Sequence, residues 1–360
     1  MINNGKAARF GFIVPVYKIK KQYLTECIES LRNQTIVDIE IILVDDCSPD
    51  DCGKLCDGFA REDSRITVVH HEVNMGLSTA RNSGIAKSSA YWLSFVDADD
   101  WVELDMCERL TNALSGMPEV PDMLMFSGCR SYPNHEETGV HQDGIHWWRT
   151  AQERGELQIL ALSQPLKSYP SVALAIDSAC GKLFRREFLI KNQLCFRPLP
   201  YREDGMFFQE AVQKASIVVK VPERSYHYRM TGNSMVNSFR PKAPDENQEY
   251  QTMLWAFARE NQKGEAYHRA LFCAAFMSMQ ICITQCFFNR GNALPFAERQ
   301  RGCKAYFGNE PYRNALTHIP FSLLKRNHLL KALCIRFRWY AGVAILRNIY
   351  LKANDYQCFE

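Results

Sequence analysis

Several features that would assign this chain to a class of protein are missing from its sequence. Its 360 residues contain 43 Lys and Arg against 40 Asp and Glu, so the net charge of +3 does not indicate a nucleic-acid partner across the whole surface. No run of about 18 uncharged apolar residues predicts a membrane span. The first nine residues lack the apolar stretch of a secretory signal. We therefore expect a cytoplasmic globular protein without a nucleic-acid partner.

Cysteine is present, with 14 residues, but not at the spacing of a disulfide scaffold or a zinc motif. The cysteines are scattered along the chain and no CxxC pair occurs. Cys52 and Cys56 are four residues apart, as are Cys282 and Cys286, which is the spacing of one helix face as well as of metal ligands. The pattern favours reduced, buried thiols over a structural zinc site.

Three glycine-containing motifs that mark common enzyme classes are also absent. No GxGxxG follows the first apolar run, which argues against a dinucleotide-dependent oxidoreductase. The chain has no GxxxxGK[ST] for a P-loop phosphotransferase and no G-x-S-x-G elbow for acyl transfer. Internal repeats and low-complexity tracts are lacking, so a solenoid or a linker is not indicated.

The N-terminal part alternates short apolar runs with helical periodicity. The alternation predicts an α/β fold, a Rossmann-like and mostly parallel sheet with helices on both faces, whose ligand site lies at the carboxyl ends of the strands. We expect strands at residues 10–16, 39–44, 66–69, 91–96 and 123–131, and helices near residues 24–31, 52–59 and 78–90. Residues 132–148, rich in His, Gly and Asn, are expected to form a loop.

The second of these helices has a clear start signal. Ser48 is expected to cap it and Pro49 to occupy its first position, while Asp50 and Asp51 suit the positive end of the helix dipole.

Helical periodicity without strand signals dominates residues 245–353. We therefore expect two domains, an α/β domain over residues 1–240 and a helical domain over residues 241–360.

An acidic cluster follows the strand expected at 91–96. Asp97 and Asp99 are two residues apart, so their side chains leave the strand end on the same side while Ala98 points away. One carboxylate of such a pair can hold Mg²⁺ or Mn²⁺ and the other can accept a hydrogen bond from a ribose hydroxyl. The alternative is that Asp99 and Asp100 cap the helix that contains Met106.

Four motifs occur in a characteristic order and spacing. They are Pro15-Val16-Tyr17, Asp45-Asp46-x-Ser48, Asn74-x-Gly76-x-x-x-Ala80-Arg81-Asn82-x-Gly84 and Asp97-Ala98-Asp99-Asp100. The set resembles the family 2 glycosyltransferases of the GT-A fold, strongly over residues 9–115 and more loosely to about 240. The resemblance implies that residues 1–240 form a catalytic domain, in which residues 9–115 bind a nucleotide sugar and residues 116–240 an acceptor.

The resemblance implies an inverting enzyme, dependent on Mn²⁺ or Mg²⁺, that moves a sugar from a UDP-sugar donor to a hydroxyl of a glycan or lipid-linked acceptor. Bacterial surface polysaccharide synthesis is the expected setting. The other interpretation is a nucleotide-sugar-binding scaffold of a synthase complex that does not turn over.

The resemblance also implies roles for individual residues. Asp46 or Asp45 would bond the uracil edge, Arg81 would lie along the nucleotide, and Asp97 and Asp99 would meet the ribose and the metal. The alternative for Arg81 is a surface helix arginine. The expected nucleotide-sugar site also includes Pro15, Val16, Tyr17, Asn74, Gly76 and Ala98.

Glu203 and Asp204 precede an apolar helix face, where acidic residues commonly interact with the helix dipole. The resemblance instead makes this pair catalytic, with Asp204 as the base that takes the proton of the acceptor hydroxyl. It also places Lys182 in a wall of the sugar or acceptor site. Ala179 and Cys180 depart from the family pattern, which leaves the contacts before Lys182 open.

Tyr226-His227-Tyr228-Arg229, together with Ser234, resembles a segment that folds over the donor diphosphate. On this basis Arg229 and Ser234 are expected at phosphate oxygens, and His227 at the metal or the phosphates. The alternative is a strand in which the alternating residues Tyr226, Tyr228 and Met230 serve packing.

The C-terminal region is basic and amphipathic. Residues 311–354 contain no Asp or Glu, while Lys and Arg alternate with Leu, Ile, Phe and Trp. Such a surface suits anionic lipid headgroups. The alternative is a helical bundle or a contact between copies of the chain, with solvated cations.

Overall fold

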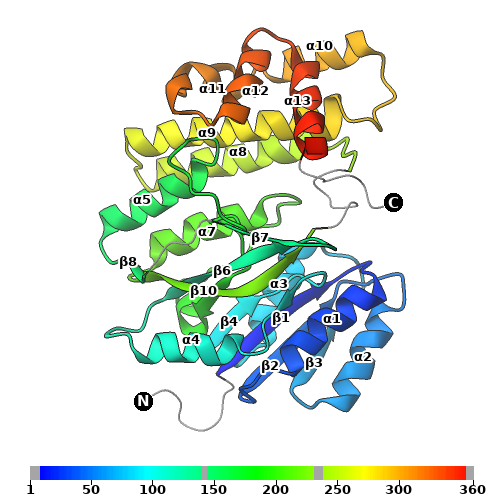
Figure 1. Ribbon diagram of the computed structural model, residues 1–360, viewed down its shortest axis with the longest axis vertical. Coiled ribbons are helices and arrows are strands. Elements are labelled where there is room, and N and C mark those ends of the chain that lie inside the picture. The colour runs from blue at the N-terminus through cyan, green and yellow to red at the C-terminus, as the bar shows by residue number, and fades with distance from the viewer. Residues whose placement is uncertain (1–8, 140–143, 231–237, 354–360) are drawn as a thin grey trace. The chain divides into compact units, whose positions relative to one another are not determined.

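A computed structural model describes residues 9–139, 144–230 and 238–353 (Figure 1). The chain forms two compact units. One contains the described residues up to Gly155 together with Ser171–Arg229, and the other contains Glu156–Pro170 and the described residues from Met230 onward. The second unit therefore contains two separate segments of the chain, and the first of them, Glu156–Pro170, precedes the boundary expected near residue 240.

The first unit is built on a ten-stranded mixed sheet in the order β3-β2-β1-β4-β9-β6-β10-β5, with β7 beside β6 and β8 beside β10. Strands β3, β2, β1 and β4 run parallel, as do β6 and β10, whereas β9, β5, β7 and β8 pair antiparallel. The predicted parallel arrangement thus holds for β1 to β4. The strands are β1 (Phe10–Val16), β2 (Ile39–Asp45), β3 (Ile66–His70), β4 (Trp92–Phe95), β5 (Trp101–Val102), β6 (Met123–Ser131), β7 (Glu136–Thr138), β8 (His146–Trp148), β9 (Lys182–Arg185) and β10 (Val218–Arg229).

Helices cover both faces of this sheet, as predicted. Alternate residues of β1, such as Phe12 and Val14, are buried in one core cluster with Leu24 of α1, whereas Ile13 points to α3 on the other face. A Cβ atom on Gly84 of α3 would lie 2.2 Å from Cγ2 of Ile13, so only glycine lets this helix approach β1 so closely. The helices of this unit are α1 (Lys21–Arg32), α2 (Cys52–Glu62), α3 (Leu77–Lys87), α4 (Met106–Ser115), α6 (Arg186–Lys191) and α7 (Glu203–Lys214), while α5 (Ala151–Leu162) continues into the second unit.

Two local predictions in this unit are wrong. Helix α2 begins at Cys52, so Ser48 does not cap it. The hydroxyl of Ser48 instead accepts a hydrogen bond from the Lys18 amide at 2.8 Å and donates one to Asp50 at 2.7 Å. The loop expected at residues 132–148 contains the short strands β7 and β8, which are held by backbone pairing with β6 and β10 rather than by an apolar period.

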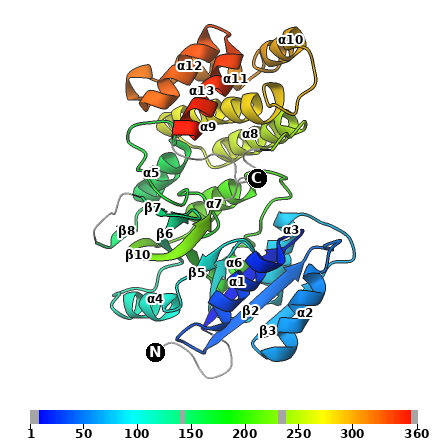
Figure 2. The same ribbon diagram turned by 45° about the vertical axis from the view of Figure 1, so that its right-hand side comes forward.

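The second unit is helical over the described residues 238–353, as predicted, apart from an isolated bridge between Leu166 and Leu324. Helix α9 packs against α8 and α11 (Figure 2). The buried core of the second unit includes Phe276, Met279 and Ile283 together with Tyr312 and Val343. The elements are α8 (Ala243–Glu260), α9 (Glu265–Cys282), η1 (Ile283–Phe287), α10 (Phe296–Tyr306), α11 (Tyr312–His318), η2 (Phe321–Leu323), α12 (Arg326–Arg336) and α13 (Tyr340–Ala353).

Among the described residues, one helical segment is long and apolar enough to cross a membrane. It is Glu265–Phe287, and 72% of its most apolar window is buried inside the structure. A buried core helix passes the same test of length and composition, so this segment is weak evidence for a span.

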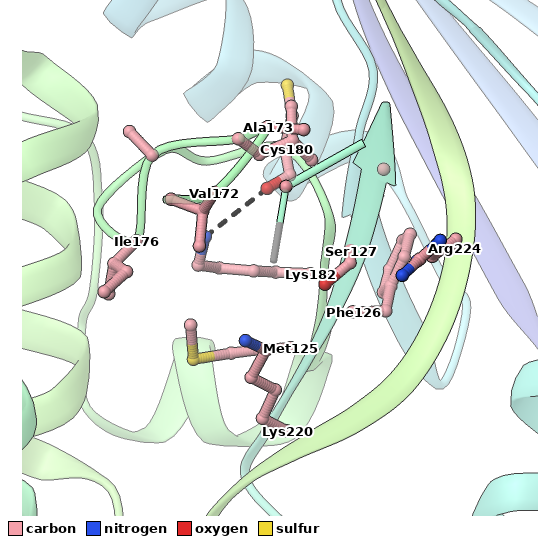
Figure 3. A pocket seen from close by; sticks show the side chains of 14 residues that line it. Met125, Phe126, Ser127, Val172, Ala173, Ile176, Cys180, Lys182, Lys220 and Arg224 are labelled. Atoms are coloured by element: carbon pink, nitrogen blue, oxygen red, sulfur yellow. Dashed lines mark hydrogen bonds between the residues drawn. The ribbon is translucent and has the colours of Figure 1, made fainter. Parts of the chain in front are cut away.

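A pocket opens in the first unit where β6, β9 and β10 meet residues 172–176 (Figure 3). Phe126 and Ile176 contribute apolar surface to its lining, and the cationic side chains of Lys182, Lys220 and Arg224 also line it.

Candidate active site

The first two predicted motifs lie together at the carboxyl ends of β1 and β2. Val16 pairs with Asp45 in the parallel ladder, and the amide of Asp46 donates to the carbonyl of Val16 at 3.0 Å. Pro15 lies one step earlier in the same ladder, and the side chain of Tyr17 is 44% exposed at the strand end. The exposed side chain of Tyr17 is therefore accessible to a bound molecule at the strand ends that carry Asp45 and Asp46.

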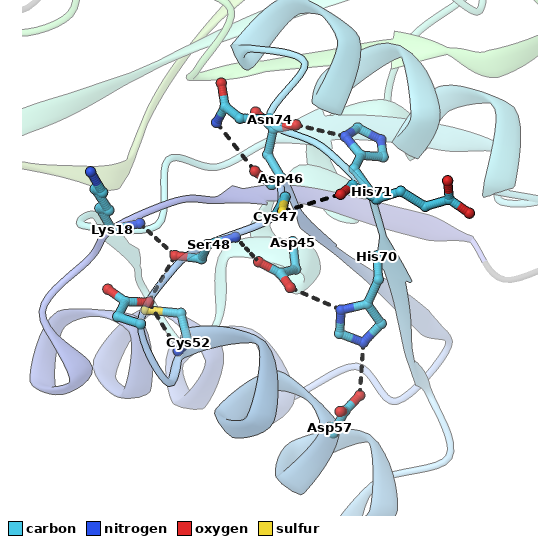
Figure 4. Close-up of polar contacts among 12 residues, drawn as sticks. Lys18, Asp45, Asp46, Cys47, Ser48, Cys52, Asp57, His70, His71 and Asn74 are labelled. Carbon is cyan, nitrogen blue, oxygen red and sulfur yellow. Dashed lines mark hydrogen bonds and ion pairs between the residues drawn. The ribbon is translucent and has the colours of Figure 1, made fainter.

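The carboxylate of Asp45 is held by the loop and the strand beside it (Figure 4). Its Oδ1 accepts the amide of Ser48 at 2.9 Å, and its Oδ2 lies 2.9 Å from Nδ1 of His70. Asp57 lies 3.1 Å from the other ring nitrogen of His70. Hydrogen bonds to Asp45 and Asp57 raise the pKa of His70 above its ordinary value.

Asp46 organises the loop that carries the third motif. It accepts the amides of Met75 and Gly76, each at 2.8 Å, and lies 2.7 Å from Nδ1 of His71. Its backbone oxygen accepts the side-chain amide of Asn74 at 3.2 Å. Gly76 adopts a φ of 85°, in the region that favours glycine, which lets this loop turn into helix α3. The structure therefore brings the predicted residues Asp46, Asn74 and Gly76 together.

Arg81 connects two acidic motifs that are far apart in the sequence. Its guanidinium donates to Glu203 at 2.7 Å and to Asp97 at 3.0 Å, and also lies over the ring of Phe196. Only 3% of the residue is exposed, so the surface alternative is wrong. Burial alone would lower the pKa of Arg81, but Asp97 and Glu203 raise it above its ordinary value. Arg81 therefore fixes the end of β4 beside the start of α7.

The turn that follows β4 is anchored by Asp100, which is fully buried. Its carboxylate accepts the hydroxyl of Tyr226 at 2.6 Å and the amide of Arg229 at 2.8 Å, and its own amide donates to the carbonyl of Asp97 at 3.0 Å. Helix α4 begins only at Met106, so the alternative that Asp99 and Asp100 cap it is wrong. Asp100 instead ties the turn to β10.

Asp99 is the carboxylate of this turn that other residues do not bind. Within the described residues, its side chain has no hydrogen-bond partner beyond its own backbone amide, although Arg229 donates to its backbone carbonyl at 2.6 Å. Burial and the neighbouring Asp97 raise the pKa of Asp99 to about 6. Ala98 between them is buried, as its place in the motif requires. Two carboxylates on one turn form the oxygen donor set that Mg²⁺ and Mn²⁺ prefer, so these residues fit such an ion.

Glu203 and Asp204 occupy the first turn of α7 and have different partners. Arg81 donates to the carboxylate of Glu203, whereas Oδ1 of Asp204 accepts the amide of the next residue, Gly205, at 2.8 Å. Burial, Glu203 and Asp177 together raise the pKa of Asp204 to about 7. A carboxyl group with a pKa near neutrality can exchange protons with a substrate hydroxyl.

Lys182 is buried in the wall of the pocket shown in Figure 3. Its ammonium group donates to the backbone carbonyls of Ser178 and Cys180, and burial lowers its pKa to about 8. The ammonium group also lies 5.5 Å from the ring centroid of Phe208, which places this wall beside helix α7.

The last predicted segment divides into two parts. Arg229 stacks on Trp101 and Tyr23 at 4.2 and 4.5 Å and forms an ion pair with Glu26 at 2.8 Å, which holds it beside Asp99. Ser234 lies outside the described residues.

His227 lies elsewhere. Its ring nitrogens contact Cys129 at 3.1 Å and Glu136 and Glu103 at 2.9 Å each, and no contact with Asp97 or Asp99 occurs within the described residues. The expectation that His227 binds the metal held by Asp99 is therefore corrected, because its strand turns the ring toward a different cluster.

Sequence reasoning missed three residues that position this site. Asp100 and Tyr226 join the turn after β4 to β10. Asn82 exchanges two hydrogen bonds of 2.8 Å with the backbone of Phe196, and so fixes the segment before α7. Asn82 and Asp100 both lie inside quoted motifs, but their partners are more than 100 residues away in sequence.

Comparison with known proteins identifies the family of this chain. Residues 12–191 match the model of glycosyl transferase family 2. The EpsH protein of Bacillus subtilis (strain 168) is 28% identical over 96% of this chain and 97% of its own length. An uncharacterized glycosyltransferase of that organism, EpsJ, is 30% identical over 90% of this chain and 91% of its own.

The chain belongs to glycosyl transferase family 2 and is a glycosyltransferase. A solved structure of S. aureus TarS (residues 1–349) in complex with UDP-GlcNAc has the same fold, with a TM-score of 0.62 and 18% identity over 96% of this chain and 92% of that one. The predicted GT-A fold, followed by a helical C-terminal region, is confirmed.

Proposed function

We propose that the protein transfers a sugar from a UDP-sugar to a hydroxyl of a glycan or lipid-linked acceptor, with inversion at the anomeric carbon, in bacterial surface polysaccharide synthesis. One observation carries the proposal. Arg81 holds Asp97 at the donor-side turn and Glu203 beside Asp204 through one buried guanidinium. The donor-side turn, which carries Asp99 as well as Asp97, and the proposed base Asp204 are thereby kept next to each other.

The donor nucleotide is proposed to lie across the carboxyl ends of β1, β2 and β4. Asp46 or Asp45 would accept the imide N–H of uracil, since the two oxygens of each carboxylate can accept more hydrogen bonds than they do in the structure. Tyr17 offers a ring to the base, and Asp97 a carboxylate oxygen to the ribose. The UDP-GlcNAc complex of TarS, a protein of the same fold, supports uridine as the nucleoside.

Asp99 is proposed to hold Mn²⁺ or Mg²⁺, because no other described residue donates to its carboxylate. When bound, such an ion neutralises the negative charge that develops on the leaving diphosphate. Arg229 lies beside Asp99 and is proposed, with Ser234, to contact phosphate oxygens.

Asp204 is proposed to accept the proton of the attacking hydroxyl. As that proton leaves, the hydroxyl oxygen forms a bond to the anomeric carbon on the face opposite the diphosphate, and the carbon–oxygen bond to the diphosphate breaks. A single displacement of this kind inverts the anomeric centre and needs no covalent enzyme intermediate. Lys182 and the pocket wall that contains it are proposed to lie on the acceptor side.

A thermal-shift screen tests the proposed donor. The purified chain is heated with UDP-, GDP- and dTDP-sugars, each with Mn²⁺ and with EDTA. A UDP-sugar at about 100 times its Kd is expected to stabilise the folded state by about 2.7 kcal/mol in the presence of Mn²⁺, because a ligand that binds only the folded state shifts the equilibrium.

The GDP- and dTDP-sugars serve as base controls and EDTA as the metal control. Equal shifts with all three bases would contradict uridine recognition. A folded protein with no shift in any arm would contradict the donor proposal altogether.

We also propose that the second unit binds the surface of an anionic membrane. Arg336, Phe337, Arg338 and Trp339 are consecutive and all exposed, with Phe337 at 76% and Trp339 at 56%. Cations flanking exposed aromatic rings suit the interface of an anionic bilayer. Further exposed apolar side chains on α12 and α13 are Leu330, Leu333, Ile345 and Ile349.

Replacing both Phe337 and Trp339 by serine is expected to weaken co-sedimentation with phosphatidylglycerol vesicles by at least about tenfold, since burying each ring contributes roughly 1.5–3 kcal/mol. Val37→Ser, at a 75% exposed apolar site of the first unit, is the matched control. Unchanged binding would contradict the proposal. Loss of a dimer in sedimentation velocity, with unchanged vesicle binding, would assign the surface to a contact between copies.

A further inference from the structure

Strands β7, β6 and β10 gather a carboxylate, a thiol and an imidazole on one face of the sheet, apart from the site described above. Cys129 of β6 lies directly across from His227 of β10, and Ser131, two residues further, lies across from Glu136 of β7. Because alternate residues of a strand share a face, the side chains at 129 and 131 point the same way. The pairing register therefore brings these groups together from three neighbouring strands.

The contacts of this cluster converge on a single atom. Nδ1 of His227 lies 2.9 Å from Oε1 of Glu136, 3.1 Å from Sγ of Cys129 and 3.3 Å from Oγ of Ser131. An imidazole nitrogen carries at most one proton, so it can donate one full hydrogen bond to these three groups. Since Oγ of Ser131 donates its proton to Oε1 of Glu136 at 2.9 Å, the groups left around Nδ1 are a carboxylate and a thiol, which can both bind a cation once the thiol is deprotonated.

We propose that Cys129, Glu136 and His227 bind a divalent transition-metal ion, with Zn²⁺ as the chemical class that fits best. The three ligand atoms lie within 4.8 Å of one another. Zinc bonds of about 2.0–2.3 Å to sulfur, nitrogen and oxygen are compatible with that separation, and a fourth position remains for water. The thiolate and imidazole distinguish this site from the all-oxygen set at Asp99, which suits a harder ion.

The ring of His227 is oriented as a metal ligand requires. Glu103 lies 2.9 Å from Nε2, so this nitrogen can donate its proton to the carboxylate and leave the lone pair of Nδ1 for the ion. Trp101 stacks on the imidazole, with centroids 4.9 Å apart and planes 9° apart.

A metal at this position would link β7, β6 and β10. Arg229 follows His227 by two positions on the same strand and contacts Asp99 and Asp100. The ion would therefore stiffen the strand that supports the donor-side turn. Zn²⁺ is therefore expected to raise the thermal midpoint of the metal-free chain by mass action.

Cobalt provides a spectroscopic test on the full chain, freed of metal by chelation and kept reduced. Wild type titrated with Co²⁺ is expected to develop visible d–d bands and a near-ultraviolet thiolate charge-transfer band, which Zn²⁺ then removes. Cys129→Ser is expected to lose the charge-transfer band. Cys195→Ser, at an exposed free cysteine, is the matched control and is expected to retain it.

Further variants separate this site from the donor-side metal. Asp99→Asn is expected to retain the charge-transfer band. Glu136→Gln, at an exposed residue, is expected to weaken Co²⁺ binding by at least about tenfold, and Glu103→Gln, a change beyond the ligands, by roughly 10–100-fold.

Circular dichroism checks that each variant is folded. If Cys129→Ser is unfolded, the Co²⁺ affinity of Glu136→Gln tests the proposed site instead. No charge-transfer band in wild type, its persistence in Cys129→Ser, or unchanged affinity in Glu136→Gln would overturn the proposal.

Discussion

Asp99→Ala is expected to abolish sugar transfer, with at least about a 10³-fold loss of kcat, together with the enhancement of UDP binding by Mn²⁺. The reason is that no other described residue donates to the carboxylate of Asp99, so an ion bound there has this side chain as its main charged ligand. A metal at the leaving diphosphate contributes several kcal/mol to the transition state, and each 1.4 kcal/mol is about tenfold in rate. Transfer is measured as UDP release, and binding by calorimetry with and without Mn²⁺.

Two further variants show whether this loss has a local cause. Asp99→Asn keeps the size of the side chain and removes its charge, so it is expected to lose activity equally without an effect on folding. Asp38→Ala changes an exposed aspartate at the opposite end of β2 and is expected to behave as wild type. Retention of metal-enhanced UDP binding in both Asp99 variants would remove Asp99 from the metal site.

The sequence predicts the parts of this site that are local. Each apolar run ends in polar residues, and parallel strands place those ends at one edge, so the proximity of Asp45, Asp46 and Asp97 follows from alternation alone. These features depend on a few neighbouring residues, and the resemblance to a known family adds their roles. Gly76 and Gly84 belong to one of the motifs, but the turn and the close approach that they allow are features of the folded structure.

The remaining parts depend on contacts that no local pattern encodes. The ion pair of Arg81 with Glu203 joins residues 122 positions apart, and it converts an apparent surface arginine into a buried connection. In the sequence Asp100 has the position of a helix cap, whereas in the structure its carboxylate accepts the hydroxyl of Tyr226 from β10. The cluster around His227 depends on the register of three strands, which the spacing of the cysteines in sequence does not reveal.

Asp204→Asn is expected to slow transfer by at least about 10²-fold while the affinity for UDP stays nearly unchanged. The amide keeps the shape of the carboxyl group but cannot accept the proton of the acceptor hydroxyl. Glu210→Gln, which neutralises another carboxylate of helix α7, is the matched control and is expected to retain activity. Single-turnover rates and UDP titrations measure the two quantities separately.

The pH dependence gives this assignment a second, independent readout. Because burial, Glu203 and Asp177 raise the pKa of Asp204 to about 7, the base is ionised only above that pH, and kcat/KM is expected to fall as the pH drops below it. A raised carboxyl pKa favours the protonated folded state, so ionisation costs stability as the pH rises through 7. Asp204→Asn should therefore be at least as thermally stable as wild type at pH 8. Near-normal turnover in this variant, or an acid limb that stays near pH 4 in wild type, would place the base on another residue.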